Sequence, residues 1–315
     1  MTGYVLQRVA WAAGVLLAAF TVTFAVLYLL PSDPVSIMLD QASTGGHVDP
    51  AQAQALRARY GLDQGPVQQY LATLGRTLRG DLGTSVASGA PVALLVAQAL
   101  PQTAALAALA LGLAVLGGGA LAWVATWTRS ARLRGLLLAL PPLGVAVPTF
   151  WVGLVLLQLL SFRVPLFPAV GNEGFASLVL PAVTLAIPLG ATVAQVLAQG
   201  MDAAWRGPYV TTALAKGASR TRVQARHVTR NAALPGLTLL GVLVGNVLAG
   251  SVVVETVFSR QGFGRLVQTA VSGQDLPVVL GLVVVAAAVF VVVNLLVDLA
   301  YPLLDPRLAR GRAVA

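Results

Sequence analysis

Side chains that could carry out chemistry are scarce in this sequence. It has no cysteine, two histidines and a single lysine, so thiolate metal sites and cysteine nucleophiles are excluded. Lys216 is followed by Gly-Ala-Ser, and no G-x-x-x-x-G-K-[ST] phosphate loop can be built around it. No apolar segment holds a pair of carboxylates for general acid–base work. We therefore do not expect an enzyme, and any step driven by ATP must take its energy from another protein.

The densest cluster of charge is a basic segment between two apolar runs, residues 205–235. It holds six cationic side chains and no acid. The cations are Arg206, Lys216, Arg220, Arg222, Arg226 and Arg230. This length and charge indicate more than a simple connection between two helices.

The spacing within the basic segment predicts two short helices. The first covers 209–216, a turn follows at Gly217, and a second, amphipathic helix covers 219–230. Gly217 supplies the positive φ that a sharp helix–helix turn needs. Ser219 is suited to be the N-cap of the second helix, and Pro235 is expected where an apolar span resumes.

Composition identifies an integral membrane protein. The residues are 57% apolar and only 10% charged, with a mean hydropathy of +0.82, which is unlike a soluble domain. Six segments could each cross the roughly 30 Å hydrocarbon core with about 20 helical residues. They cover about 9–30, 97–127, 135–162, 178–204, 234–257 and 278–304. We interpret the first as an uncleaved anchor. The prolines in these segments indicate kinked, bundled helices, and the Gly117–Gly118–Gly119 run is expected to allow close packing.

The distribution of charge predicts the orientation. With the N-terminus inside, the inner segments hold 13 of the 20 cationic residues and three of the 11 acids. This positive-inside bias accounts for most of the basicity, so nucleic acid is not expected as a partner. The same topology puts His47 and His227 on opposite sides of the membrane, where they cannot share a metal or a catalytic triad.

One sizeable extramembrane segment, 31–95, lies on the outer side in this topology. It reads as two short amphipathic helices within 49–78. Asp49-Pro50 would begin the first, and Val67, Tyr70, Leu71, Leu74 and Leu78 give the second an apolar face. Spacing alone favours a cap that seals the outer mouth, and a contact surface for a partner or substrate is the alternative.

Polar groups within the apolar spans are few. Asn246 and Glu255 are candidates to line a pathway, because a buried ionisable group is costly and is kept for a reason. For Glu255 a local structural pairing is the alternative, and for Asn246 it is an interhelical hydrogen bond.

Several motifs, in order along nearly the whole chain, resemble one family: the B-type permeases of the dipeptide/oligopeptide/nickel class of ATP-binding-cassette (ABC) importers. They are LLPSDPV at 29–35, DPAQAQALRARYGLDQGPVQQY at 49–70, GDLGTS at 80–85, LFPAVG at 166–171, LVLPAVTLAI at 178–187, the loop YVTTALAKGASRTRVQARHVTRNAALP at 209–235, VVVETVFSRQGFGRL at 252–266 and YPLLDPR at 301–307. Two departures are Gln261, where the family commonly has Pro, and Thr211, where the EAA loop consensus has Glu.

The resemblance implies an all-α fold with six transmembrane helices, similar to type I ABC importer permeases, in the bacterial inner membrane with both termini cytoplasmic. Residues 1–315 would form one membrane domain, with 31–95 as the extracytoplasmic segment and 205–233 as the cytoplasmic coupling loop. The implied partners are a second, related permease, one or two ABC ATPase subunits, an extracytoplasmic substrate-binding protein and membrane lipids. ATP and Mg²⁺ would bind the ATPase subunits, so no cofactor or metal is expected in this chain.

The resemblance also implies contact residues. Those expected to meet the ATPase are Tyr209, Thr212, Ala213, Ala215, Lys216, Gly217, Ala218, Arg222 and Arg226. Those expected to face the binding protein are Arg57, Arg59, Arg76 and Asp81. At 100° per residue, Arg222, Arg226 and Arg230 share one helix face and Arg220 opposes them. We expect the three-arginine face to meet lipid phosphates or acidic residues of an ATPase, while Val223 and the 209–213 turn enter its groove.

Alternatives remain for the loop, the substrate and the class. Two basic amphipathic helices could instead lie on anionic lipid. The expected cargo is a peptide, and nickel or another metal chelate, glutathione or a haem-like ligand are the other substrates of this class. A stand-alone channel or secondary transporter would need charged or broken-helix sites at the midplane and inverted repeats, which this sequence lacks.

Overall fold

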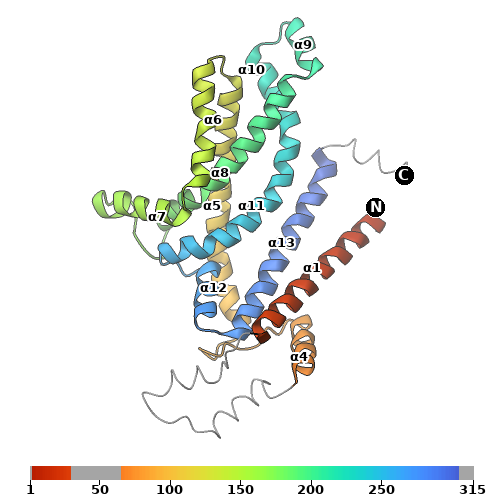
Figure 1. Cartoon of the computed structure of the whole chain (residues 1–315), viewed down its shortest axis with the longest axis vertical. Coiled ribbons are helices and arrows are strands. Elements are labelled where there is room, and N and C mark those ends of the chain that lie inside the picture. The colour runs from red at the N-terminus through yellow and green to blue at the C-terminus, as the bar shows by residue number, and fades with distance from the viewer. Residues whose placement is uncertain (1, 30–64, 305–315) are drawn as a thin grey trace. The chain divides into compact units, whose positions relative to one another are not determined.

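The computed structural model describes residues 2–29 and 65–304, and every long element among them is a helix (Figure 1). The helices are α1 (Thr2–Leu29), α4 (Pro66–Leu78), α5 (Val92–Trp127), α6 (Ala131–Ala146), α7 (Thr149–Leu157), η1 (Gln158–Arg163), α8 (Ala176–Trp205), α9 (Pro208–Ala215), α10 (Arg220–Val223), η2 (Gln224–Val228), α11 (Thr229–Val257), α12 (Phe263–Ser272) and α13 (Leu276–Leu304). The predicted helix at the start of 49–78 lies outside the described residues.

Four of the predicted spans are confirmed as long apolar helices. Within the described residues, α1, α5, α8 and α13 are long and apolar enough to cross a membrane, and a bent pair would make five. The fifth predicted span, 234–257, falls within α11. The structure thus supports four to five spans by length and composition.

The predicted span over 135–162 is sharply bent, a kink of the kind that its prolines indicate. Two helices, Ala131–Ala146 and Thr149–Arg163, meet at an angle of 97°. Val147, at the break, has an extended backbone with φ −80° and ψ 128°, and Pro148 follows it. The proline ring disfavours helical geometry at the residue before it, so the helix ends there although the apolar run continues.

Pro235 does not begin a helix, although an apolar span was expected to resume there. Pro235 lies inside α11, which begins at Thr229. The helix is unbroken from Arg220 through η2 to Val257. A proline inside a membrane helix is tolerated when neighbouring groups satisfy the freed backbone carbonyl.

The described chain divides into two compact units, and each is considered by itself. Unit 1 comprises residues 1–101 and 266–291, and unit 2 comprises 102–265 and 292–315. In unit 1, α4 packs on α1 through Tyr70, whose ring lies 5.6 Å from Phe20 and 5.3 Å from Phe24, edge to face. The predicted apolar face of α4 is only partly covered, because Leu71 is 59% and Leu78 is 79% exposed.

The GDLGTS stretch of unit 1 is held by one buried carboxylate, Asp275. Asp275 accepts hydrogen bonds from the Ser85 hydroxyl at 2.6 Å and from the backbone N–H groups of Val86 and Ala87 at 3.1 and 3.2 Å. Since these partners are some 190 positions apart in the chain, the motif serves to join the segment before α5 to the start of α13.

Unit 2 is built around α8, against which α6, α7 and α11 pack. The helices approach very closely at one point of the glycine run. A Cβ on Gly118 would lie 2.3 Å from the carbonyl oxygen of Gly190 in α8, whereas one on Gly117 would meet nothing within 4 Å. The expected close packing is therefore confirmed for Gly118, where α5 and α8 touch backbone to backbone.

Candidate functional site

The turn at Gly217 is as predicted. Gly217 has φ +82°, and the two hydrogen bonds of a Schellman motif close helix α9. The N–H of Ala218 donates to the Ala213 carbonyl at 3.1 Å, and the N–H of Gly217 donates to the Leu214 carbonyl at 2.9 Å. Glycine suits this position because it alone adopts left-handed geometry without a Cβ penalty.

The second loop helix starts at the predicted cap and then changes its winding. The Ser219 hydroxyl accepts a hydrogen bond from the Arg222 N–H at 3.3 Å, which caps α10. From Gln224 to Val228 the helix is a π-helix, in which each bond spans five residues. Val223 and Val228, five residues apart, consequently face the same core, and both are fully buried.

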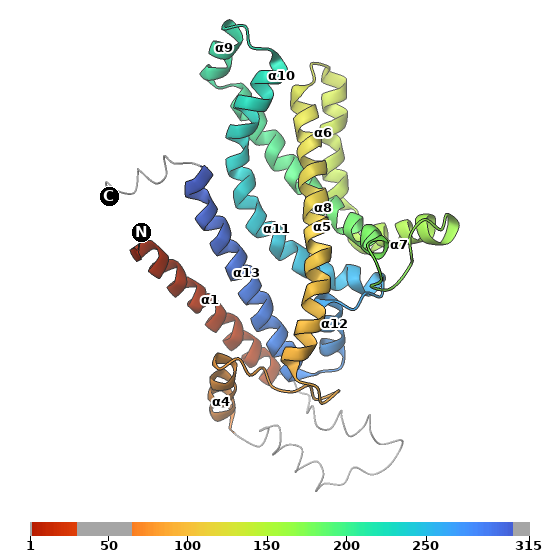
Figure 2. The same ribbon diagram turned by 180° about the vertical axis from the view of Figure 1, so that it is seen from behind.

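The loop follows directly on the end of α8 (Figures 1 and 2). It packs on an apolar floor supplied by the ends of α5 and α8. Buried alanines and methionine of these helices meet valines of α9, α10 and η2, with Trp123, Trp205, Ala213 and Ala218 packed around them. The buried members are Ala122, Ala198, Met201, Ala204, Val210, Val223, Val228 and Ala232. The loop is therefore a packed part of unit 2 and is not a free connection.

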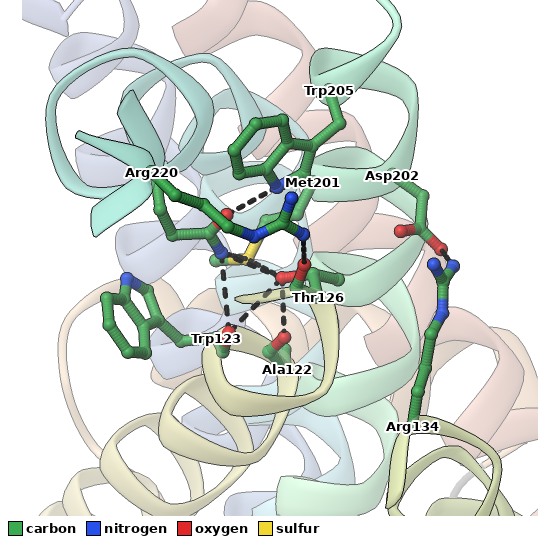
Figure 3. A network of polar contacts seen from close by, with 9 residues as sticks. Ala122, Trp123, Thr126, Arg134, Met201, Asp202, Trp205 and Arg220 are labelled. Atoms are coloured by element: carbon green, nitrogen blue, oxygen red, sulfur yellow. Dashed lines mark hydrogen bonds and ion pairs between the residues drawn. The ribbon is translucent and has the colours of Figure 1, made fainter. Parts of the chain in front are cut away.

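Arg220 binds the end of α5, as Figure 3 shows. Its guanidinium donates to the carbonyl oxygens of Trp127 at 2.7 Å and Thr126 at 3.1 Å, and lies 4.3 Å from the Trp205 ring centroid. Carbonyls in the last turn of a helix lack partners within the helix, and a cation there also complements the helix dipole. Burial lowers the pKa of Arg220, and the charges of Arg129 and Arg134 lower it further.

The three arginines expected on the outer face of the second helix are exposed. Arg222, Arg226 and Arg230 are all exposed, whereas Arg220 turns inward. The expected entry of Val223 into a partner's groove was wrong, because Val223 is completely buried in this chain's own core. The π turn and the apolar floor take the place that we had assigned to a partner.

The remaining predicted contact residues separate into exposed and packed ones. Tyr209 is 38% exposed, and its hydroxyl donates to the Ala204 carbonyl at 2.9 Å. The exposed members of the set are Tyr209, Thr212, Ala215, Lys216, Gly217, Arg222 and Arg226, and the half-buried ones are Ala213 and Ala218. The structure thus brings all nine together at one end of unit 2.

The candidates outside the loop lie elsewhere and not in this cluster. Arg76, on α4, and Asp81 are exposed, and Asp81 accepts a hydrogen bond from the Gly83 N–H at 2.9 Å. Arg57 and Arg59 lie outside the described residues.

Asn246 is exposed on α11, whereas Glu255 is only 1% exposed. Glu255 accepts hydrogen bonds from the Thr103 hydroxyl at 2.5 Å and from the Arg265 N–H at 3.0 Å. The neighbouring Arg260 is also buried and donates to the Ser177 carbonyl at 3.0 Å. Burial lowers the pKa of Arg260, and the Glu255 charge opposes this shift. The geometry around Glu255 is that of a structural pairing.

Sequence reasoning missed the polar groups that hold the loop. Gln224, Thr126 and Trp205 bond to one another beneath it. The sequence signal was weak: Gln224 stands in the middle of the predicted amphipathic helix 219–230, where a polar residue is expected to face solvent, and Trp205 suits an interfacial belt.

The fold and the loop together define a class: a multi-pass helical membrane protein with a packed, basic helix–turn–helix at the ends of α5 and α8. Comparison with known families gives the assignment. Residues 114–310 match the model of the binding-protein-dependent transport system inner membrane component, and residues 1–107 match the model of its N-terminal membrane component. The chain belongs to this family of inner-membrane permease subunits of ABC importers.

Relatives cover the full length. A putative peptide transport system permease protein of Brucella abortus (strain 2308) is 34% identical over 98% of this chain and 99% of its own length. The oligopeptide transport system permease protein AppB of Bacillus subtilis (strain 168) and the dipeptide transport system permease protein DppB of Lactococcus lactis subsp. cremoris (strain MG1363) are each 30% identical, again over 98% of this chain and 99% of theirs. These matches confirm the resemblance to B-type permeases.

Proposed function

We propose that this chain is one of two permease subunits of an ABC importer that carries di- or oligopeptides into the cell. The observation that supports the cargo is the full-length similarity to permeases named for peptides, oligopeptides and dipeptides. An extracytoplasmic binding protein delivers the peptide, and one or two ATPase subunits, which bind ATP and Mg²⁺, drive its passage.

The proposal includes six crossings of the membrane with both termini in the cytoplasm. The bent pair α6–α7 and the helix α11 complete the six. The excess of cations in the segments beside α9 and α10 supports this orientation. Residues 31–95 then face the binding protein, with Arg57, Arg59, Arg76 and Asp81 as its polar contacts.

We assign the loop 205–233 to docking on the ATPase. A coupling element must transmit displacement, and this loop is already rigid, capped and packed before any partner binds. Its exposed side chains, from Tyr209 to Lys216 and on the three-arginine face, remain available for contact with the ATPase. A helix pair that only rested on lipid would need an apolar face turned outward, whereas the valines here face the chain's own core.

The two pathway candidates differ in exposure, because Asn246 is exposed and Glu255 is buried. Asn246 presents its amide outside this chain, where the second permease or the substrate would lie. Glu255 would have to leave a buried network to reach a substrate.

Reconstitution tests the function. The chain is purified with its second permease and ATPase subunits, placed in proteoliposomes and supplied with the binding protein. ATP-dependent uptake of dipeptides and tetrapeptides is then compared with that of nickel chelate, glutathione and haem. Uptake of a non-peptide alone would overturn the cargo, and uptake of peptide without nucleotide or ATPase subunits would overturn the importer mechanism.

A further inference from the structure

A buried amide joins three helices beneath the loop. Gln224, the first residue of η2, is completely buried. Its Nε2 donates to the Thr126 hydroxyl at 2.7 Å and to the Trp123 carbonyl at 3.4 Å, and its Oε1 accepts a hydrogen bond from the Trp205 indole N–H. The two ends of the amide face partners of opposite character, which sets its orientation.

The side chains that bond to this amide, Thr126 and Trp205, each make a further contact. The Thr126 hydroxyl donates to the Ala122 carbonyl within α5 at 2.9 Å, so that it is left to accept from Gln224 (Figure 3). Trp205 is the last residue of α8, and its ring also lies beneath the Arg220 guanidinium. One side chain therefore connects the ends of α5 and α8 to the helix that carries the loop.

The Gln224 amide and the Thr126 hydroxyl are packed against apolar groups. Ala122, Met201 and Val223 are each at most 2% exposed. In such a setting a polar atom that loses its partner cannot turn to water, so the broken state is much less favourable than the closed one. A second contact, the ion pair of Arg134 and Asp202 at 2.6 Å, joins the start of α6 to α8 close by, but both of its side chains are partly exposed. The buried amide is consequently the more restrictive connection.

We propose that Thr126, Trp205 and Gln224 form a latch that makes the loop and the adjoining ends of α5 and α8 move as one body. This inference rests on the proposed function, because the body must be displaced by an ATPase subunit for the latch to matter to transport. The three residues are positioning residues. They touch neither nucleotide nor substrate, and they set how much of the displacement of the loop reaches the helices of the pathway.

The substitution Gln224→Leu tests the latch in the complete complex, since leucine keeps the bulk and removes every hydrogen bond of the amide. We expect the ATP hydrolysed per peptide imported to rise about tenfold, because one unsatisfied buried donor shifts a two-state equilibrium by roughly that factor. Thr126→Val should act in the same direction, and the double variant should be little worse than either single one, since both break the same network. Gln199→Leu, the same change at an exposed position of α8, is the matched control and should leave the ratio unchanged.

The ratio separates positioning from simple destabilisation. A simple loss of stability would lower the amount of complex, and with it both peptide uptake and ATP hydrolysis, but it would leave the ATP hydrolysed per peptide unchanged. An unchanged ratio in Gln224→Leu would therefore overturn the latch. An unchanged Gln224→Leu complex would overturn it as well.

Hydrogen–deuterium exchange of the detergent-purified chain gives an answer that does not depend on transport. Amides of 209–223 should exchange faster in Gln224→Leu than in the wild type and the Gln199→Leu control. If the wild-type complex imported no peptide, the proposed function would fail, and the exchange rates would still decide the latch: equal rates in the two leucine variants would overturn it.

Discussion

Gly217 is the position where a single added side-chain atom, a Cβ, should reduce coupling most while it changes the fold least. Its φ is +82°, and a Cβ built there meets nothing within 4 Å. Any effect of a substitution must then come from backbone strain and not from a clash. Left-handed geometry costs an ordinary residue about 1–2 kcal/mol, and a β-branched one up to about 3 kcal/mol.

These costs predict an order among variants. Asparagine tolerates the left-handed region, so Gly217→Asn should be nearly neutral. Gly217→Ala should weaken the docked geometry of α9 by about 1–2 kcal/mol, roughly a 5- to 30-fold shift in equilibrium. Gly217→Val should shift it further. A steric explanation would give no such order, because the space is open for all three.

Peptide uptake by proteoliposomes, divided by the amount of reconstituted complex, measures the effect. The control is Gly75→Ala, because Gly75 also has open space around it but has no positive φ. Uptake should fall in the order Gly, Asn, Ala, Val, with Gly75→Ala at the wild-type level. Full uptake by Gly217→Val, or an asparagine variant as poor as the valine one, would refute the strain argument.

Three further outcomes are expected. Gly118→Ala should destabilise the purified chain by about 1–3 kcal/mol and so lower its melting temperature, because the added Cβ would lie 2.3 Å from a backbone oxygen. Gly117→Ala should leave the melting temperature unchanged, and equal effects of the two substitutions would contradict the close helix approach. Ala215→Cys should cross-link to the ATPase subunit in the assembled complex, and Gln68→Cys, at an exposed position of α4, should not. Cross-linking from Gln68→Cys and not from Ala215→Cys would show that the ATPase docks outside the loop. Glu255→Ala should lower the free energy of unfolding by about 3 kcal/mol, since the Thr103 hydroxyl and the Arg265 N–H lose their acceptor. An unchanged melting temperature together with lost peptide uptake would instead indicate that Glu255 lines the substrate pathway.

Local features of the loop were predictable because their causes are local. A positive φ selects glycine, and a hydroxyl placed before a helical run caps it, so Gly217 and Ser219 could be assigned from their neighbours alone. The opposed exposure of Arg220 and Arg222 followed from helical periodicity, which the short α10 obeys.

Other features depended on tertiary context. Val223 was expected to meet a partner, but η2 changes the period from four to five residues and turns Val223 and Val228 to the same core. Periodicity based on 3.6 residues per turn has no means to detect that change. The prolines predicted a kink in the 135–162 span, but its sharpness at Pro148 could not be predicted, because hydropathy does not register the backbone restriction that proline places on Val147. Gln224 escaped attention because burial of an amide becomes favourable only when three partners from distant segments converge on it.

The π turn and the latch occupy the same place, and this coincidence has a mechanical consequence. The helix runs unbroken from Arg220 to Val257, so displacement of the loop passes directly into α11. Along α11, a Cβ on Gly200 of α8 would lie 3.3 Å from the Ala232 side chain, and one on Gly250 would lie 2.8 Å from Leu185. Such close contact lets α8 and α11 move together but not slide. We expect this path to bend most easily at η2, because π geometry is rare and occurs mostly as single turns within α-helices. Gln224 begins that turn and is bonded there to α5 and α8. The latch therefore stiffens the stretch at which the push of a docked ATPase would otherwise be absorbed by bending.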